Sequence, residues 1–418
     1  MTLRIKRREF LFGVAGGVSS VCLLNSLPFA RLACPEARAD LLDKNRHVLV
    51  VVFLRGGFDG LSLICPTEGQ DRRDYESARP HLGLPLTGPF AALRLDDRFA
   101  INSAAQPLHS LFNEKRLAFI QACGLPVPSR SHFAAQTLME LGVSRTGEDN
   151  RGWLTRFIEQ VPCKAAAVGA LRPTSLQGAP GIMAFARLKG LGLEGSSAQQ
   201  VQLRSALRKL YGESGQTASY GQTALNMLDE LEDIFLRPQG KDKFDLPSGE
   251  IAQKLAIAAH LLQRDEKLQL VTLDIGGWDT HRQQGSTGDG YFAKQLGLLS
   301  RSLADFYQQM LTMTNAWVTT VVMSEFGRRL KENGNRGTDH GHGNVMMVMG
   351  PRIRGGMLHG RWPGLANENL FERSDLAATT DSRLVLHRCL QTIAPQLTMN
   401  AVFPRAESSS ASELNLLL

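Results

Sequence analysis

The sequence predicts an α/β fold with a mostly parallel central sheet and helices on both faces. Hydrophobic runs rich in β-branched residues alternate with stretches of helical composition along most of the chain. Such alternation is typical of a parallel sheet covered by helices. In addition, four of the runs end in a short polar cluster, and a fifth cluster follows the last of the four after a loop. Because open α/β sheets bind ligands at the carboxyl ends of their strands, the clusters predict a binding crevice there.

The hydrophobic runs give five strands. The first, His47-Val-Leu-Val-Val-Val-Phe-Leu54, has little polar content and reads as a central strand buried on both faces. The other four strands are expected over residues 117–122, 268–273, 317–323 and 345–349. Helices are expected over residues 133–141, 198–210, 223–235, 250–263 and 292–312.

The middle of the chain differs in character. Residues 151–243 show no clear strand and no comparable polar cluster, which favours a mostly helical insertion or cap. Residues 237–244 resemble a polar linker that contains Pro and Gly. We therefore expect one α/β domain over residues 40–405, with an insertion at 151–243 and a flexible Ser-rich tail over 406–418.

The N-terminus has the pattern of an export signal. A twin arginine, Arg7-Arg8, precedes an apolar stretch of about 14 residues, and Ala37-Arg38-Ala39 offers a cleavage site. The order of basic, apolar and small residues predicts a signal peptide over residues 1–39, and the twin arginine indicates the Tat route. A membrane anchor is the alternative, but the stretch is shorter than the ~20 residues that span a bilayer. We therefore expect a periplasmic or secreted protein that meets the Tat translocase during export.

Charge and cysteine content exclude two classes of function. The whole chain carries a formal charge of +7, but residues 1–39 hold six Lys or Arg and two Glu, so about +3 remains for the rest. That balance, without a dense basic stripe, argues against nucleic-acid binding. Four cysteines follow the signal without C-x-x-C spacing, which argues against a structural zinc knot. We expect these cysteines either to form one or two disulfides or to remain buried free thiols.

The first two clusters offer a carboxylate and a serine. In Arg55-Gly56-Gly57-Phe58-Asp59-Gly60, Asp59 lies in a tight turn and either binds a divalent cation or caps the turn. In Ser129-Arg130-Ser131-His132, Ser131 lies at the predicted start of a helix. There it either caps the helix or serves as a nucleophile, because a helix N-terminus favours anions. His132 adjoins it.

The remaining clusters are rich in metal-ligand residue types. The third cluster contains Asp274, Asp279 and His281 within eight residues, a density that packing alone does not explain. In the fourth, Glu325 could bind metal, act as a general base or pair with an arginine such as Arg328. The fifth contains Asp339, His340 and His342 among glycines, which indicates a metal-binding loop. His340 and His342 point the same way only if that piece is extended, so one of them could be a bystander.

These motifs resemble those of the DUF1501 family, a group of mostly exported bacterial proteins of uncharacterised function. The resemblance covers nearly the whole chain after the signal. It rests on Phe53 to Leu61, Arg130 to Phe133, Gly152-Trp153-Leu154, Gly277 to His281, Ser324 to Arg328, Gly337 to Gly341 and Asp381-Ser382-Arg383. The family in turn resembles the alkaline phosphatase and sulfatase superfamily, whose members hold two divalent cations and use a Ser, Thr or modified Cys nucleophile.

The superfamily resemblance implies roles for individual residues. Ser131 would be the nucleophile and Asp59 a ligand from the first strand. Asp279 and His281 would bind one metal, and Asp339 and His340 the other. Arg55 or Arg328 would neutralise the transferring group.

The sequence also departs from the superfamily pattern. Glu325 stands where the superfamily usually has the Asp of an Asp-His pair, and Asp339-His340 comes about a dozen residues later. Either Asp339-His340 is the pair on a longer loop, or Glu325 replaces the Asp and His340 supplies the histidine. The Asp279–His281 step is also shorter than usual, and the Cys-x-Pro-x-Arg signature of conventional sulfatases is absent from the sequence.

Two functions follow as expectations. The first is an exported hydrolase of phosphate or sulfate esters that uses two divalent metals (Zn, Mn, Mg or Ca) and either Ser131 or a metal-bound water as nucleophile. Its partner would be a small-molecule or polymeric ester. The second is a metal-binding envelope protein that lacks catalysis and acts with a protein partner.

Overall fold

The computed structural model describes residues 46–169, 172–185, 196–212, 216–235, 247–313, 315–406 and 414–418. The expected signal peptide, the expected linker at 237–244 and residues 407–413 of the expected tail lie outside these ranges.

The described elements alternate between strands and helices along the chain. The strands are β1 (Arg46–Leu54), β2 (Ile64–Pro66), β3 (Leu93–Arg94), β4 (Phe99–Ile101), β5 (Leu117–Gly124), β6 (Lys164–Val168), β7 (Met183–Phe185), β8 (Leu268–Ile275), β9 (Ala316–Met323), β10 (Arg328–Glu332), β11 (Thr338–His340), β12 (Asn344–Met349), β13 (Leu358–His359) and β14 (Thr380–Asp381). The α-helices are α3 (Gly60–Leu63), α4 (Gly69–Ala78), α5 (Gln106–Asn113), α6 (His132–Leu141), α7 (Trp153–Gln160), α8 (Ser197–Leu210), α9 (Gln216–Phe235), α10 (Glu250–Arg264), α11 (Tyr291–Met313), α12 (Ser382–Gln391) and α13 (Met399–Val402). Short 3₁₀ turns are η2 (Ser103–Ala105), η3 (Thr174–Leu176) and η4 (Asn367–Asn369).

The central sheet is mostly parallel, as the sequence predicts. Its order is β13-β5-β12-β9-β1-β8-β6-β7, and β14 also pairs with β5. Strand β1 is parallel to both of its neighbours, β8 and β9. Strand β12 is the exception, because it is antiparallel to β9 and β5. The segment between β9 and β12 is a hairpin without a crossover helix, so the chain returns beside β9 in the opposite direction.

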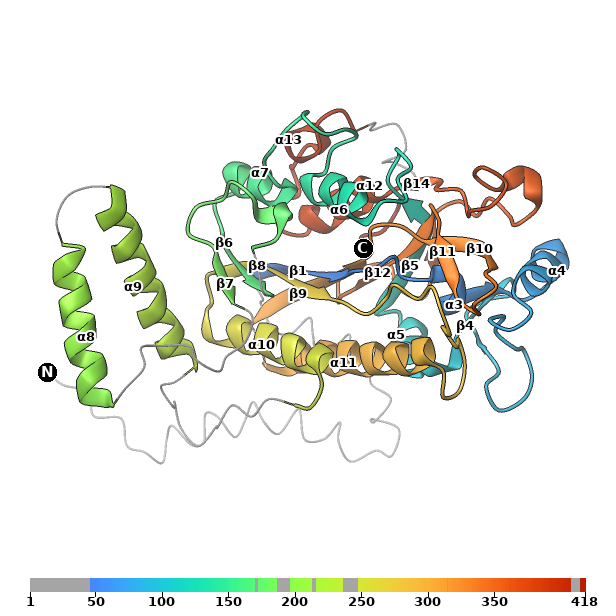
Figure 1. Ribbon diagram of the computed structural model, residues 1–418, viewed down its shortest axis with the longest axis horizontal. Helices are drawn as coiled ribbons and strands as arrows, with labels where there is room; N and C mark the ends of the chain where they lie inside the picture. Colours follow the sequence, from blue (N-terminus) through green and yellow to red (C-terminus); the bar gives the residue numbers. More distant parts are fainter. Residues whose placement is uncertain are drawn as a thin grey trace, which may run out of the picture. The chain divides into compact units, whose positions relative to one another are not determined.

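Helices cover both faces of this sheet (Figure 1). Val48, Val50 and Val52 of β1 belong to the hydrophobic core under α10, α11 and α5. Leu49 and Val51 belong to the opposite core, which α6, α7 and α12 close. Alternate residues of the strand therefore enter different cores, which confirms that β1 is buried on both faces.

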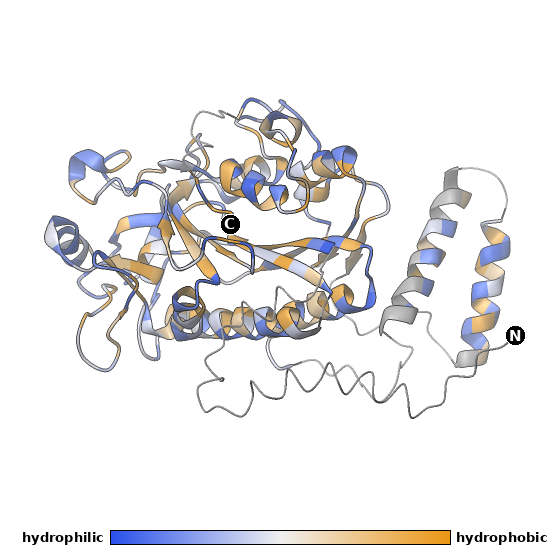
Figure 2. Cartoon of the chain, turned by 180° about the vertical axis from the view of Figure 1, so that it is seen from behind, coloured by the Kyte–Doolittle hydropathy of each residue, from blue (hydrophilic) through white to orange (hydrophobic). Residues whose placement is uncertain are grey.

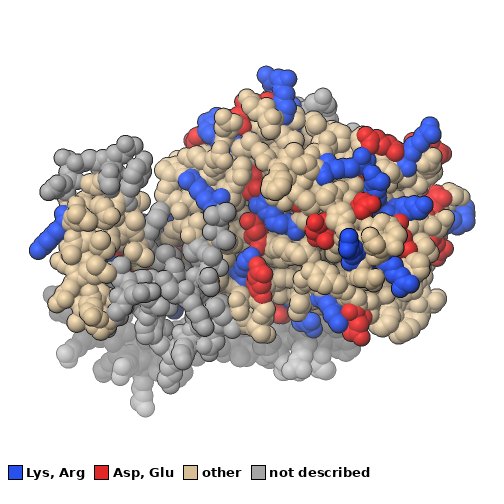
Figure 3. Space-filling model, in the orientation of Figure 1, with Lys and Arg blue, Asp and Glu red and all other residues tan. Residues whose placement is uncertain are grey.

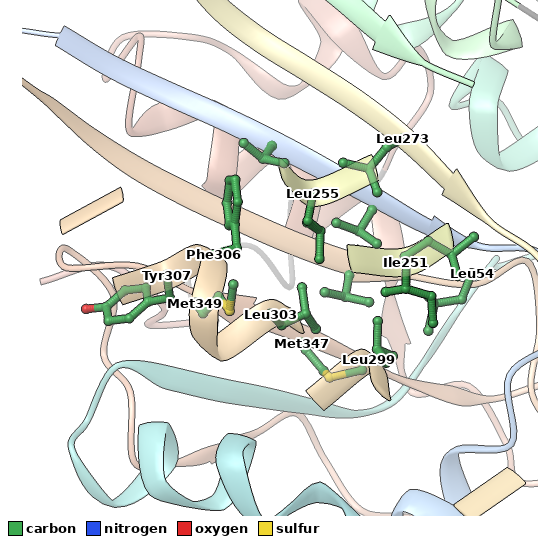
Figure 4. Close-up of a cluster of buried hydrophobic side chains, with 14 of the residues drawn as sticks. Leu54, Ile251, Leu255, Leu273, Leu299, Leu303, Phe306, Tyr307, Met347 and Met349 are labelled. Carbon is green, nitrogen blue, oxygen red and sulfur yellow. The ribbon is translucent and has the colours of Figure 1, made fainter. Parts of the chain in front are cut away.

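Figure 4 shows how the first of these cores is filled. Leu54 and Leu273 of the sheet lie with Ile251 and Leu255 of α10, while α11 contributes Leu299, Leu303 and Phe306. Hydrophobic colouring runs along the sheet strands, whereas the covering helices carry both hydrophilic and hydrophobic positions (Figure 2). The helices are thus held by one apolar face each, as their periodicity requires.

The topology brings the polar clusters to one edge of the sheet. Strands β1, β8 and β9 are mutually parallel, and β5 runs the same way because β12 is antiparallel to both β5 and β9. The carboxyl ends of β1, β5, β8 and β9 therefore lie at the same edge, where β12 begins. The loops after all four strands and the hairpin β10–β11 meet there.

The segment 151–243 differs from the expectation of a strand-free insertion. It contains β6 and β7, which extend the central sheet beyond β8. Strand β6 is Lys-Ala-Ala-Ala-Val, and an alanine run lacks the β-branched composition that marked the other strands. The helices α8 and α9 of this segment pack on each other, with Arg204 of α8 paired to Asp229 and Glu232 of α9.

The C-terminal end also differs from the expected flexible tail. Leu414 and Leu416 are buried, and Arg354 N–H donates to the carbonyl of Leu416 at 2.8 Å. Two apolar side chains therefore hold the last five residues against the body of the protein, although the preceding sequence is Ser-rich.

Surface charge, helix composition and the state of the cysteines bear on the classes of function considered from the sequence. On the face drawn in Figure 3, basic and acidic side chains are interspersed. Within the described ranges, none of the helices combines the length and apolar composition needed to cross a membrane. Cys65, Cys123, Cys163 and Cys389 are free thiols.

Candidate metal centre

Four side chains from three segments of the chain meet at the carboxyl edge of the sheet. His132 is the first residue of α6, which follows β5, and His340 ends β11. Asp279 and His281 lie in the loop after β8. Among the described residues, His132, Asp279 and His340 form the one group of ligand-type side chains close enough to share a metal ion, with their ligand atoms within 4.8 Å of one another.

The cluster is centred on one carboxylate oxygen. Asp279 Oδ1 lies 3.6 Å from Nε2 of His132, 3.1 Å from Nε2 of His281 and 3.3 Å from Nε2 of His340. The Nε2 atoms of His281 and His340 are 2.9 Å apart. The structure thus joins residues that the superfamily resemblance assigned to two separate metals.

The outer nitrogen of each imidazole faces a hydrogen-bond acceptor. His132 Nδ1 lies 2.8 Å from Oε1 of Glu325, and His281 Nδ1 lies 3.0 Å from Oδ1 of Asp339. His340 Nδ1 lies 2.8 Å from the backbone carbonyl of Arg130. Carboxylates and carbonyls only accept, so each Nδ1 carries the proton and donates it. In the neutral rings, all three Nε2 atoms then present bare lone pairs to the cluster.

This arrangement fits a bound cation. Two lone pairs facing each other at 2.9 Å repel unless a proton or a cation lies between them. His132 Nε2 is buried and has no hydrogen-bond partner within the described part of the chain. Four ligand atoms about 2.0–2.1 Å from one tetrahedral zinc lie roughly 3.3–3.4 Å apart. The three distances from Asp279 Oδ1 and the distance between His281 and His340, 2.9–3.6 Å, span that value.

Glu325 supports the cluster from behind. Its side chain is fully buried, and Oε1 also accepts from Gln136 Nε2 at 2.8 Å and from Gly56 N–H at 2.9 Å. Burial opposes ionisation, but the hydrogen bonds, led by that of Gln136, hold the pKa of Glu325 below its ordinary value. An ionised carboxylate on the outer nitrogen of a ligand histidine is the usual support of a metal site.

Asp279 and His340 show opposing effects of burial and charge. Burial raises the pKa of Asp279, but the Arg328 guanidinium at 2.7 Å outweighs it and lowers that pKa. Burial lowers the pKa of His340, which favours the neutral imidazole that binds metals. Hydrogen bonds from Asn333 and His281 lower the pKa of Asp339.

Two glycines let the loops approach one another. Gly56 has φ +120°, and a Cβ there would lie 2.6 Å from the backbone nitrogen of Asp279. A Cβ on Gly337 would lie 2.2 Å from the carbonyl carbon of His281. Side chains at these positions would push the ligand loop away, which explains why glycines flank the polar clusters.

Arg328 holds the loops together. Its buried guanidinium donates to the carbonyls of Gly57, Gly56, Thr338 and Trp278 as well as to Asp279. These contacts occupy the donors that would otherwise neutralise a substrate group.

Arg55 forms a separate network at the same edge. It pairs with Glu140 at 2.8 Å and with Asp274 at 2.9 Å. The structure therefore places Asp274 with Arg55 and outside the histidine cluster.

Asp59 and His342 also lie apart from the cluster. The Asp59 side chain is fully buried, and Arg79 binds its two oxygens at 2.7 and 3.0 Å. Burial opposes ionisation of Asp59, but Arg79, Ser62 and Gln284 together lower its pKa. His342 contacts the carbonyl of Leu125 at 3.1 Å, and burial lowers its pKa. Of the two histidines in the fifth cluster, only His340 joins the other ligand-type side chains.

Ser131 stands at the N-cap of α6, as its position in the sequence predicts. Its hydroxyl makes no capping hydrogen bond, and the residue is exposed. The capping role is thus not realised, and the hydroxyl lies open to solvent beside His132.

Sequence reasoning did not single out several contributors to the site. Gln136, Asn333 and Arg79 bind carboxylates described above, and Glu140 accepts from Arg55. A signal existed only for Gln136, which follows His132 by four residues and therefore shares its helix face. The other three reach the site through tertiary contacts that leave no spacing in the sequence.

Comparison with known proteins gives a family and several distant structures. The family model described as "Protein of unknown function (DUF1501)" matches residues 46–392. No curated protein sequence matches the chain. Among solved structures, the PsFucS1 sulfatase from Pseudoalteromonas sp. is 10% identical with a TM-score of 0.37, over 91% of this chain and 74% of that one. The Ps i-CgsB structure in complex with k-i-k-neocarrahexaose is 10% identical with a TM-score of 0.38, over 85% and 74%. Similarity at this level does not allow an activity, a substrate or a site to be transferred to this chain.

Proposed function

The chain belongs to the DUF1501 family, and we propose that it is a metal-dependent hydrolase of phosphate or sulfate esters. The observation that supports this most is the convergence of three imidazole Nε2 atoms on the carboxylate of Asp279. The expectation of an ester substrate comes from the superfamily resemblance.

The ligand set favours zinc over the harder cations. Three imidazoles and one carboxylate suit Zn²⁺, whereas Mg²⁺ and Ca²⁺ prefer oxygen ligands throughout. A divalent cation held by His132, Asp279, His281 and His340 would polarise an ester oxygen and stabilise the charge that develops there. The side chain of Asp279 is 49% exposed, so an ester can reach this position from solvent.

Ser131 is the proposed nucleophile. Its exposed hydroxyl lies at the N-terminus of α6, where the helix dipole favours negative charge. The Ser131 oxygen would bond to the phosphorus or sulfur, and its proton would pass to solvent. The bond to the leaving oxygen would break, and that oxygen would take a proton from solvent and depart as an alcohol or phenol. Water would then cleave the serine ester and release phosphate or sulfate.

A test separates Ser131 from the metal ligands. Ser131→Ala should abolish turnover of aryl phosphates and sulfates while the protein retains its metal, measured by elemental analysis. Turnover equal to that of the wild-type protein would remove Ser131 from this role.

The second candidate is a metal-binding envelope protein that lacks catalysis. The placement of Asp59 and Asp274 favours it, because both expected ligands are bound to arginines instead. Metal retention without turnover of any phosphate monoester, phosphodiester or sulfate would support this candidate.

The site of action is proposed from the N-terminal sequence. Arg7-Arg8 and the following apolar stretch support Tat export to the periplasm or beyond, with folding and metal loading before export. Replacement of both arginines by lysine should leave the protein in the cytoplasm, as fractionation would measure.

A further inference from the structure

Phe133 is an exposed aromatic residue that directly follows His132, a proposed metal ligand, in the chain. Its residue exposure is 87%, the highest of the large hydrophobic residues that the structure describes. It lies between His132, a proposed ligand, and the body of α6, and the exposed Ser131 precedes both. Consecutive Cα atoms are about 3.8 Å apart, so the Phe133 ring starts within a few ångströms of the ligand's backbone.

The other faces of α6 make contacts within the protein. Ala135, Leu138 and Met139 are buried in the core, and Gln136 binds Glu325. Of the apolar residues in the first turn, Phe133 alone is exposed. Because the Phe133 side chain is exposed, it contributes little to folding. Packing therefore does not account for a phenylalanine at this position.

A second exposed aromatic residue contacts the loop that supplies Asp279 and His281. Tyr291 begins α11, is 47% exposed, and donates its hydroxyl to the carbonyl of Gly277 at 3.0 Å. Gly277 precedes Asp279 by two residues. Each of two chain segments that supply ligands thus has an exposed aromatic side chain attached to it.

We propose that Phe133 and Tyr291 form an aromatic rim that binds a ring in the leaving group of the ester. The inference rests on the proposed function and names its substrate class: phosphate or sulfate esters borne on a ring, either an aryl group or the apolar face of a sugar. Aromatic side chains supply large apolar area at low entropy cost, which suits this use.

The expected effect is about tenfold in affinity. A bound ring that covers roughly 60 Å² of the Phe133 side chain, at about 25 cal/mol per Å², corresponds to that factor. Because Phe133 is exposed, Phe133→Ala should leave the fold and the metal affinity unchanged.

Binding of phosphonates tests the inference without turnover, because their P–C bond resists hydrolysis. Calorimetry would compare methylphosphonate, phenylphosphonate and a glucose phosphonate on the zinc-loaded protein. The ring compounds should bind wild-type protein about tenfold more tightly than methylphosphonate, and Phe133→Ala should remove that preference. Phe133→Trp should retain it. The ring compound with the larger preference identifies the source of the ring.

The matched control is Phe90→Ala, which removes another exposed phenylalanine, 48% exposed, whose ring lies close to Gly288, nine residues after Asp279. Equal binding of ring and methyl compounds by wild-type protein would overturn the inference, as would an unchanged preference in Phe133→Ala or an equal loss in Phe90→Ala. Absence of ester turnover with the ring preference intact would instead refute only the proposed hydrolase.

Discussion

Replacing Glu325 by glutamine tests whether this residue orients His132 for metal binding. The substitution removes a buried charge and keeps the shape of the side chain. The amide oxygen can stay in the position of Oε1 and accept from His132, Gln136 and Gly56. The amide nitrogen then faces Ser324 Oγ, which can accept it because its own proton can go to the carbonyl of Leu54 at 2.7 Å.

The loss should appear in metal affinity rather than in folding. Partners of ligand histidines typically contribute 10- to 100-fold to affinity. We expect Glu325→Gln near the lower limit, about tenfold or ~1.4 kcal/mol, because the hydrogen bond to His132 persists and only the charge is lost. Glu325→Ala should approach 100-fold, and leaving the Gly56 and His132 donors without an acceptor should also destabilise the fold by about 1–3 kcal/mol.

Competition with a chromogenic chelator measures the zinc affinity, and thermal unfolding of the metal-free protein measures the fold. Glu332→Gln is the matched control, since Glu332 pairs at 2.5 Å with His81, a histidine that is not a proposed ligand. An unchanged zinc affinity in a folded Glu325→Gln protein would refute the role of Glu325, as would an equal loss in Glu332→Gln.

Further predictions concern the buried ion pair and the two neighbouring histidines. Arg79→Met leaves the buried Asp59 carboxylate unpaired and should lower the free energy of unfolding by about 3–5 kcal/mol. The control Arg73→Met changes an exposed arginine and should lower it by about 0.5 kcal/mol or less. Urea unfolding measures both variants. The pKa of Asp59 is lowered in the folded state, so its contribution to stability is present above about pH 4 and is lost as the pH falls through the folded pKa. The difference in unfolding free energy between wild type and Asp59→Asn should therefore shrink on acidification, and a constant difference from pH 7 to pH 3 would argue against that linkage. His340→Ala should abolish tight zinc binding while His342→Ala leaves it intact; equal losses in both would contradict the assignment of His342 as a bystander.

The sequence alone predicts the central strands and the edge of the sheet where the polar loops meet. Strand β1 is a run of β-branched residues buried on both faces, a signal that local composition carries. Parallel strands place their carboxyl ends together, so the histidine and carboxylate clusters could be expected at one edge before any contact was known. Strand β6 escaped prediction because alanine has no β-sheet preference that composition could reveal.

The contacts between clusters could not be predicted, because they depend on how the loops fold back. The hairpin β10–β11 pairs Arg328 with His340, which returns His340 to the level of the loop after β9. This explains the dozen residues that separate Glu325 from Asp339. Neither of these two carboxylates joins the inner ligands: Glu325 supports His132, and Asp339 supports His281.

The contacts of Asp59 could not be predicted from the sequence either. A carboxylate in a glycine-rich turn after the first strand matched a metal ligand in sequence, but Arg79 reaches it from the end of α4 and satisfies both oxygens. Nothing in the spacing of the two residues indicated this pair.

X-ray absorption spectroscopy of the zinc-loaded protein tests the central claim most directly. The account predicts retained zinc with a first shell of nitrogen and oxygen at about 2.0–2.1 Å and the outer-shell scattering of three imidazoles. That imidazole signal should fall in His132→Ala. Zinc that dialysis removes completely, or a shell of oxygen ligands without imidazole scattering, would contradict it.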